Sequence, residues 1–354
     1  MSPLHSTVQD SGSGPPAFHV REATPEDNEA LLSLDRQCVV AAATPVAFDR
    51  SPDFFARSRP YPSWRAYVAE GEAGLIGVGA MTLKSVLVDG RQVEAAYFYD
   101  LRVAPDFRRL GVAKAVGDAI RAYTRSLHPA VGYSLVMEGN IPSLSFVQER
   151  GSRPLRACAL SLIPVEAVSA PASGRLRLLE DRETESALRL ARAAHPDHDL
   201  FPFPDVESLQ DRLRRVAGLG FRGMYGWESD GRLCGCFGLW DYSPVMRMRI
   251  LQATGEWSWA TGHDLHQVFL MPLGFRTPAG VAESVRWAAT RLRREAPDAA
   301  QVLAVPHDLA DARYAALGEF RPIRLGFTLF GLELGGAGNL SLGSRPVFVD
   351  PADL

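Results

Sequence analysis

The feature that most constrains the fold of this chain is the segment 97–123, which reads YFYDLRVAPDFRRLGVAKAVGDAIRAY. It begins with an aromatic and β-branched run that ends at Val103, and Ala104-Pro105-Asp106 then breaks the pattern. Apolar residues follow at helical spacing, namely Val112, Ala115, Val116, Ala119, Ile120 and Tyr123. The segment therefore predicts a strand, a short turn and a helix in direct succession.

The turn between strand and helix has the composition of an anion-binding site. It consists of Arg108, Arg109, Leu110, Gly111, Val112 and Ala113. The first N–H groups of a helix lack intrahelical partners and lie at the positive end of the helix dipole, so they suit a phosphate. Gly111 removes a Cβ where the backbone approaches the ligand, and an arginine adds a bidentate donor. The pattern predicts a pyrophosphate cradle, and an ordinary turn with solvated arginines is the alternative.

The N-terminal half around this turn resembles the GNAT family of acyl-CoA N-acyltransferases. The turn matches the family pattern Arg/Gln-x-x-Gly-x-Gly/Ala through Arg108, Gly111 and Ala113. The expected elements follow the order found in the family. They are a first strand and the entry to a helix at 18–27, strands at 64–69 and 75–88, a hairpin turn at Asp89-Gly90, a strand at 132–137 and a helix that ends at Gly151. The resemblance implies that the turn binds the pyrophosphate of acetyl-CoA or a related acyl-CoA.

The C-terminal half repeats this order in outline after a Pro/Ala/Ser-rich linker at 164–174. Strands are expected at 175–179, 223–228, 232–241, 266–270 and 301–305, and helices at 180–194, 209–216, 278–295 and 310–318. The counterpart of the phosphate turn, residues 271–280, lacks the motif, and Pro278 removes an N–H from the expected first helical turn. This half is therefore expected to brace the first and to close one wall of the acceptor cleft without binding acyl-CoA.

These observations predict an α/β (α+β) fold of two tandem GNAT-like domains, each with a mixed, mostly antiparallel central sheet flanked by helices, the second degenerate. The predicted boundaries are a disordered tail at 1–17, a catalytic domain at 18–163, the linker, a degenerate domain at 175–334 and a C-terminal tail at 335–354. The segment FDRSPDFF at 48–55 is also similar to a segment found in a group of bacterial tandem acetyltransferases.

Composition narrows the class of protein further. A net charge of −3 gives no electrostatic case for nucleic acid. No apolar run approaches the length of about 18 residues that a membrane helix needs, and the start of the chain lacks a secretory pattern, so no membrane partner and a cytoplasmic location are expected. The four cysteines, at 38, 158, 234 and 236, lack metal-ligand spacing, so no metal is expected. A homodimer is left open.

The resemblance also implies roles for individual residues. Backbone amides of Leu101, Arg102 and Val103 would hold the pantetheine arm and polarise the thioester carbonyl, and Asn140 would bind the same arm. Asp100 is the first candidate for the general base, and an ion pair with Arg102 is its structural alternative. The second-rank candidates are Tyr97, Tyr99, Glu94 and Glu138.

The general acid expected from the family is absent. The family places a tyrosine four residues before the glycine that ends its last helix, and this count gives Val147 here. The thiolate then leaves unassisted, or Ser143 or Ser145 donates the proton. The same count in the second half gives Tyr314, which is expected to be a packing residue.

The sequence limits the acceptor only to a chemical class and does not identify the compound. The segment 44–64 is rich in aromatic residues and has no acidic cluster, which argues against a polycation. The prediction is an acyl-CoA-dependent N-acyltransferase acting on a small-molecule or peptide amine. A non-catalytic acyl-CoA sensor or scaffold is the alternative.

Overall fold

The computed structural model describes residues 17–72, 74–295, 301–332, 334 and 342–354. The first half contains, in order, β1 (Phe18–Glu22), α1 (Asn28–Gln37), β2 (Val46–Asp49), β3 (Ser63–Gly71), β4 (Gly74–Val88), β5 (Arg91–Val103), α2 (Val112–Ser126), β6 (Val131–Met137), α3 (Ile141–Glu149) and β7 (Arg153–Pro164). A 3-10 helix, η2 (Phe54–Ser58), lies between β2 and β3. The predicted strand, turn and helix of segment 97–123 are all present.

The second half contains β8 (Arg175–Leu178), α4 (Thr184–Ala194), α5 (Val206–Ala217), β9 (Phe221–Ser229), β10 (Arg232–Asp241), β11 (Arg247–Ile250), β12 (Asp264–Phe275), α6 (Gly280–Glu295), β13 (Gln301–Asp308) and β14 (Ile323–Leu332). Two expectations differ from this order. The helix expected at 310–318 is a run of 3-10 turns, Ala312–Phe320. The expected counterpart of the phosphate turn is mostly strand, because β12 continues to Phe275.

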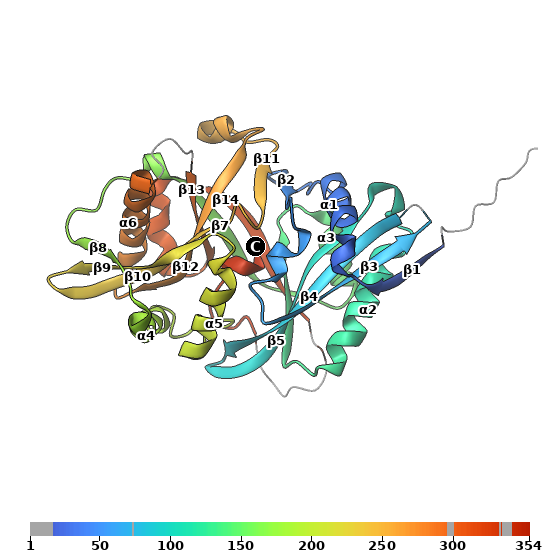
Figure 1. Ribbon diagram of the computed structural model, residues 1–354, viewed down its shortest axis with the longest axis horizontal. Helices are drawn as coiled ribbons and strands as arrows, with labels where there is room; N and C mark the ends of the chain where they lie inside the picture. Colours follow the sequence, from blue (N-terminus) through green and yellow to red (C-terminus); the bar gives the residue numbers. More distant parts are fainter. Residues whose placement is uncertain (1–16, 73, 296–300, 333, 335–341) are drawn as a thin grey trace, which may run out of the picture.

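The strands form a single mixed sheet with the order β1-β3-β4-β5-β6-β14-β7-β13-β12-β10-β9-β8. The pairs β5–β6 and β12–β13 are parallel, and the other pairs along this order are antiparallel. At the centre the two halves exchange strands: β14 pairs with β6, and β7 pairs with β13 (Figure 1). The division at 164–174 therefore remains a prediction, because each half completes the sheet of the other.

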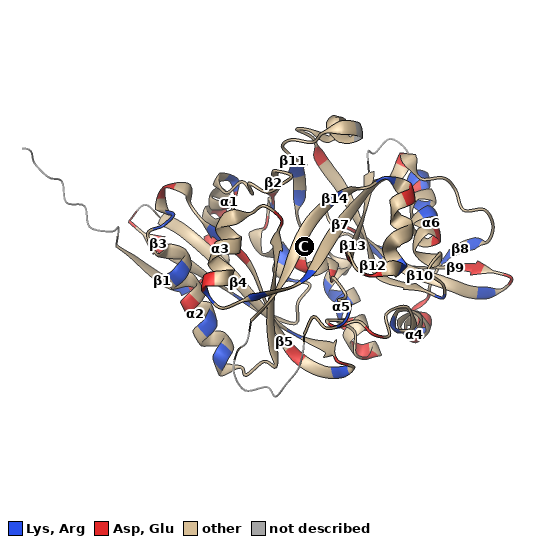
Figure 2. Cartoon of the chain, turned by 180° about the vertical axis from the view of Figure 1, so that it is seen from behind, with Lys and Arg blue, Asp and Glu red and all other residues tan. Residues whose placement is uncertain are grey.

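Local sequence explains the elements that position the site. Asp89 and Gly90 have φ values of 53° and 72°, the left-handed conformation that a two-residue hairpin turn between β4 and β5 requires. Helix α2 buries Val112, Val116 and Ile120 against the sheet. Figure 2 shows basic and acidic residues interspersed on α2 and α6. Within the described residues, no helix has the length and apolarity needed to span a membrane.

The structure describes the two predicted tails to different extents. The N-terminal tail lies outside the described residues except for Ala17. The predicted C-terminal tail at 335–354 is only partly described, and its last part, the segment 346–354, packs into the fold. Residues 347–353 are buried, and the chain pairs there with Asp199 through backbone hydrogen bonds from Asp199 N–H to Pro346 O (2.9 Å) and from Phe348 N–H to Asp199 O (2.8 Å).

Candidate active site

The site begins where β5 and β6 separate. The two strands pair from Ala95↔Val131 to Tyr97↔Tyr133, and no pairing between them continues beyond this point. The register of β5 against β4 also shifts here, from Ala80↔Tyr99 to Val78↔Arg102, which leaves one extra residue on β5. Asp100 lies in this bulge with a φ of 57°. The bulge and the separation together open a gap in the sheet at Phe98 to Arg102.

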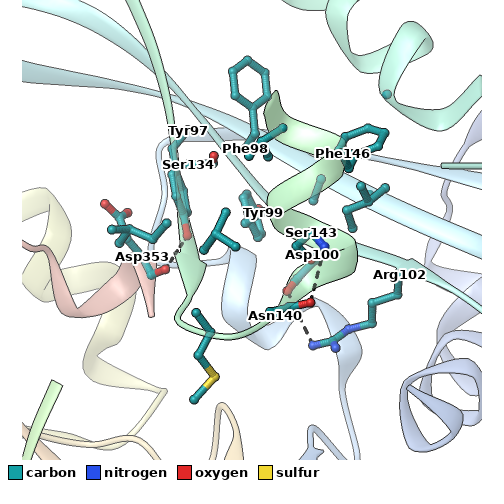
Figure 3. A pocket seen from close by; sticks show the side chains of 18 of the residues that line it. Tyr97, Phe98, Tyr99, Asp100, Arg102, Ser134, Asn140, Ser143, Phe146 and Asp353 are labelled. Carbon is teal, nitrogen blue, oxygen red and sulfur yellow. Dashed lines mark hydrogen bonds and ion pairs between the residues drawn. The ribbon is translucent and has the colours of Figure 1, made fainter. Parts of the chain in front are cut away.

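A pocket runs through this gap and has two differently lined sides. On the α2 side Phe98 and Ile120 belong to an apolar cluster, and Gly117 and Phe146 complete the wall. On the other side lie Tyr97, Tyr99, Asp100, Arg57, Arg102, Met137, Phe327, Asp353 and Leu354. Figure 3 shows side chains from β5, α3 and the segment 346–354 converging on this pocket. Leu101, Asn140, Ser143 and Val147 also line it, whereas Val103 does not.

The predicted cradle at 108–113 stands at the start of α2, the helix that lines the pocket through Gly117 and Ile120. Arg109 and Gly111 have φ values of 65° and 83°, and such positive-φ turns direct successive N–H groups into a concavity that suits anions. No side chain caps the helix at Gly111, and a Cβ there would meet no atom within 4 Å. The start of α2 is therefore uncapped and open at Gly111, and the binding of a phosphate there stays a prediction.

Asp100 lines the pocket, but its contacts do not favour the role of general base. Its two carboxylate oxygens accept hydrogen bonds from Arg50, each at 2.7 Å, and Oδ1 also accepts from Arg57. Burial alone would raise the pKa of Asp100, but the charges of Arg50, Arg57 and Arg102 outweigh burial and hold this pKa well below its usual value. A carboxylate that is so strongly stabilised is a poor proton acceptor.

The tyrosines of β5 are hydrogen-bond donors in the structure. Tyr97 is 1 % exposed, and its hydroxyl donates to the carbonyl of Asp353. Tyr99 donates to Ser58 Oγ at 2.8 Å. Burial raises the pKa of both hydroxyls, so neither is suited to accept a proton from an amine.

Of the other residues that the sequence analysis names for the site, some line the pocket and some do not. Asn140 caps α3 by accepting a hydrogen bond from Ser143 N–H at 3.4 Å, and it faces the pocket. Glu138 and Glu94 are exposed and do not line the pocket. Tyr314 is buried and lies 2.8 Å from His195 Nε2, which fits the predicted packing role.

Sequence reasoning missed a buried charge network that connects the pocket with the segment 346–354. Lys84 of β4 lies 2.7 Å from Asp353 and 3.2 Å from Asp350. Arg212 of α5 binds both oxygens of Asp350 at 3.0 Å. The one signal available was Lys84 itself, a lysine in the otherwise largely apolar strand sequence MTLKSVLV. Its partners, more than 260 residues away, had no recognisable pattern.

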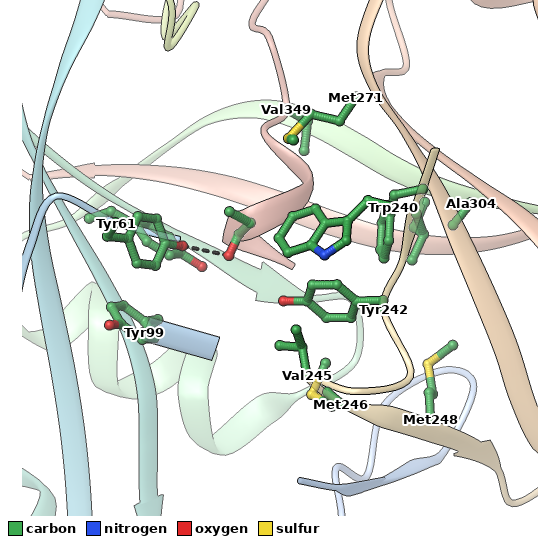
Figure 4. Close-up of a cluster of buried hydrophobic side chains, with 14 of the residues drawn as sticks. Tyr61, Tyr99, Trp240, Tyr242, Val245, Met246, Met248, Met271, Ala304 and Val349 are labelled. Carbon is green, nitrogen blue, oxygen red and sulfur yellow. Dashed lines mark hydrogen bonds between the residues drawn. The ribbon is translucent and has the colours of Figure 1, made fainter. Parts of the chain in front are cut away.

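Aromatic residues from both halves pack beside this network. Figure 4 shows Tyr61 and Tyr99 from the first half facing Tyr242 and Trp240 from β10 and the residues that follow it. The hydroxyl of Tyr61 donates to the carbonyl of Ala352 in the segment 346–354. The side of the pocket that contains Tyr99 is therefore backed by the second half of the chain.

Solved structures of N-acyltransferases have this fold. Saccharomyces cerevisiae N-myristoyltransferase, solved with bound myristoyl-CoA and inhibitors, gives a TM-score of 0.63 at 14 % identity, over 98 % of this chain and 91 % of that chain. A tandem GNAT protein from the clavulanic acid biosynthesis pathway gives 0.61 at 13 % identity, over 90 % of this chain and 99 % of that chain. A probable N-acyltransferase from Enterococcus faecalis V583 gives 0.51 at 12 % identity, over 90 % and 72 %.

The sequence itself matches no family model and no curated protein. At these identities the structural likeness establishes the fold, and the chain has the GNAT fold that its sequence predicts. The predicted fold class is thus confirmed, although the strands form one large, mostly antiparallel sheet flanked by helices where the sequence predicted a central sheet in each half.

Proposed function

We propose that this chain is an acyl-CoA-dependent N-acyltransferase that moves an acetyl or related acyl group from CoA to the amine of a small-molecule or peptide acceptor. The observation that carries the proposal is the pocket through the gap between β5 and β6, which is lined by α2, the helix whose start is uncapped. The cradle at 108–113 would bind the pyrophosphate, and the pantetheine arm would follow α2 into the gap past Asn140.

The reaction that fits this arrangement is direct transfer. The lone pair of a neutral amine attacks the thioester carbonyl, a C–N bond forms, the C–S bond breaks, and the proton released by the amine ends on the departing thiolate. Backbone N–H groups at Leu101 and Arg102, at the open edge of β5, are the candidates to polarise the carbonyl. Because Asp100 is held by two arginines, we propose that the amine loses its proton to water in the pocket.

This proton route has a measurable consequence. Without a protein base, kcat/KM should rise with pH until the acceptor amine itself is neutral, and the midpoint should follow the pKa of the acceptor when the acceptor is changed. The experiment is to mix the protein with acetyl-CoA and a broad amine library and to measure the release of CoA thiol. A midpoint that stays fixed across acceptors of different pKa would instead reveal a titrating protein base.

A second candidate function is a non-catalytic acyl-CoA sensor. It is favoured by Val147, which lines the pocket where the family places an acidic hydroxyl. The same library separates the two functions, because CoA binding without thiol release from any amine would support the sensor.

A further inference from the structure

The acceptor side of the pocket contains a buried arginine whose donors are largely unused. Arg102 lines the pocket, and its side chain is 9 % exposed. Its Nε lies 2.7 Å from Asp35 Oδ1 but off the direction of a hydrogen bond. Its nearest other carboxylate is Asp100, at 3.9 Å. Within the described residues its buried Nε, one of the donor atoms of a guanidinium that carries five N–H groups, has no hydrogen-bond partner.

The neighbouring arginines show that this state is specific to Arg102. Arg50 binds Asp100 through two hydrogen bonds, and Arg57 binds Asp100 and the carbonyl of Asp353. Both oxygens of Asp100 are therefore already occupied. Asp35 of α1 is the carboxylate nearest to Arg102, does not line the pocket, and also lies 3.8 Å from Arg50 Nε.

The side chains grouped around Arg102 carry more positive than negative charge. Three guanidinium groups, those of Arg50, Arg57 and Arg102, stand against the two carboxylates of Asp35 and Asp100. Burial, together with the charge of Arg50, lowers the pKa of Arg102. A buried cation without a full set of partners is costly, and an anion in the pocket would complete both the charge and the hydrogen bonds.

We propose that Arg102 binds the carboxylate of the acceptor, so that the acceptor is an amino acid whose amine reaches the gap between β5 and β6. This inference rests on the proposed function. Val40, Phe48, Met137 and Phe327 line the same side of the pocket, so the amino acid has an apolar side chain. The guanidinium of Arg102 lies 5.9 Å from the ring centre of Phe48, which places the charge and the apolar wall together.

The test compares the apolar and aromatic amino acids with their carboxamides as acceptors of acetyl from acetyl-CoA. At least one acid should exceed its amide in kcat/KM by about ten- to a hundredfold, the range expected for hydrogen bonds to a charged group. Amidation lowers the pKa of the amine, so amine availability alone would favour the amide. Arg102→Gln should abolish the preference, and Arg102→Lys should retain part of it because the charge remains.

Three controls separate recognition of the carboxylate from an effect on folding. The ratio of acid to amide is measured within one preparation, so it does not depend on the fraction folded. The double variant Arg102→Gln/Asp35→Asn removes both charges of the buried pair, and it should also lose the preference. Arg36→Gln removes a neighbouring but exposed arginine of α1 and should leave the ratio unchanged.

A binding measurement tests the carboxylate site even if no amine is acetylated. 3-Phenylpropionate and 3-phenylpropionamide lack an amine, and calorimetry in the presence of CoA should show weaker binding of the amide, with the difference lost in Arg102→Gln. Turnover without any acid preference, or equal binding of acid and amide, overturns the carboxylate site. A binding preference without turnover of any amine supports the site and rejects the acyltransferase. If neither turnover nor binding is observed, both the carboxylate site and the acyltransferase function are rejected.

Discussion

At the scale of single residues, Asp100 shows what a sequence can and cannot tell about a site. Its place at the open end of β5 is predictable, because the strand, the turn and the helix follow each other within segment 97–123. Its partners Arg50 and Arg57 come from 50 and 43 residues earlier in the chain. No spacing rule connects these positions, so the sequence suggests a base where the structure has an ion-pair network.

The network predicts the effect of Asp100→Asn. The variant leaves Arg50 and Arg57 buried without their shared carboxylate, and the free energy of unfolding should fall by about 3–5 kcal/mol. Urea unfolding measures this loss. Asp118→Asn, which breaks exposed ion pairs with Lys114 and Arg150, is the matched control and should cost about 1 kcal/mol or less. A stable Asp100→Asn enzyme with turnover lowered by orders of magnitude would restore the base role.

A second residue makes a prediction about pH. Burial, with a further contribution from the neighbouring His198, lowers the pKa of His195 from 6.5 to about 3 and outweighs the hydrogen bond to the carbonyl of Ala191, which acts in the opposite direction. Below about pH 6.5 the imidazole of His195 is protonated in the unfolded chain but stays neutral in the folded chain. The free energy of unfolding therefore falls as the pH drops, by at most about 1.4 kcal/mol per pH unit. His195→Gln should have a shallower loss between pH 6.5 and 4 in urea melts. An unchanged slope would show that His195 is protonated in the fold.

At the scale of elements, the patterns that were predictable are those whose cause is local. The hairpin at Asp89-Gly90, the run of α2 and the uncapped turn at Gly111 each follow from residues within a few positions. The helix expected at 310–318 fails because the buried side chains of Tyr314, Leu317 and Phe320 repeat every three residues, the period of a 3-10 turn.

The start of α2 predicts how Gly111→Glu behaves. The wild type should gain about 2.7 kcal/mol of stability from CoA at a hundred times its dissociation constant. The variant adds bulk and negative charge where the pyrophosphate is proposed to bind, so thermal melts should show no shift with CoA. Gly90→Glu is the matched control, since Gly90 also has a positive φ and open space at its Cβ but lies in the β4–β5 hairpin. An equal CoA shift in both variants would exclude the cradle.

At the scale of the whole molecule, the two halves have a similar order of elements but differ at the turn for which we propose CoA binding in the first half. At the start of α6, a Cβ on Gly280 would lie 2.5 Å from the side chain of Phe275, so this turn is packed where the turn at Gly111 is open. Titration calorimetry should therefore give one CoA per chain. A stoichiometry of two would show that the second half has a cofactor site of its own.

The exchange of β7 and β14 and the burial of the segment 346–354 could not be predicted from the sequence. Strand pairing across the centre depends on which edge each strand meets after the halves have folded, and the pattern of β14 suits either neighbour. The last segment lacks helical or strand periodicity, and Asp350 and Asp353 look like surface residues until Lys84 and Arg212 are placed beside them.

This network predicts that the segment 346–354 joins the halves through balanced charge. Asp350→Asn leaves Lys84 and Arg212 with Asp353 as their one remaining carboxylate, so the free energy of unfolding should fall by about 3–5 kcal/mol. Adding Arg212→Met restores the balance between Lys84 and Asp353, and the double variant should recover much of that loss in urea unfolding. If the two substitutions act independently, their losses add, and the double variant is less stable than Asp350→Asn. That result would show that packing rather than charge balance holds the segment 346–354 in place.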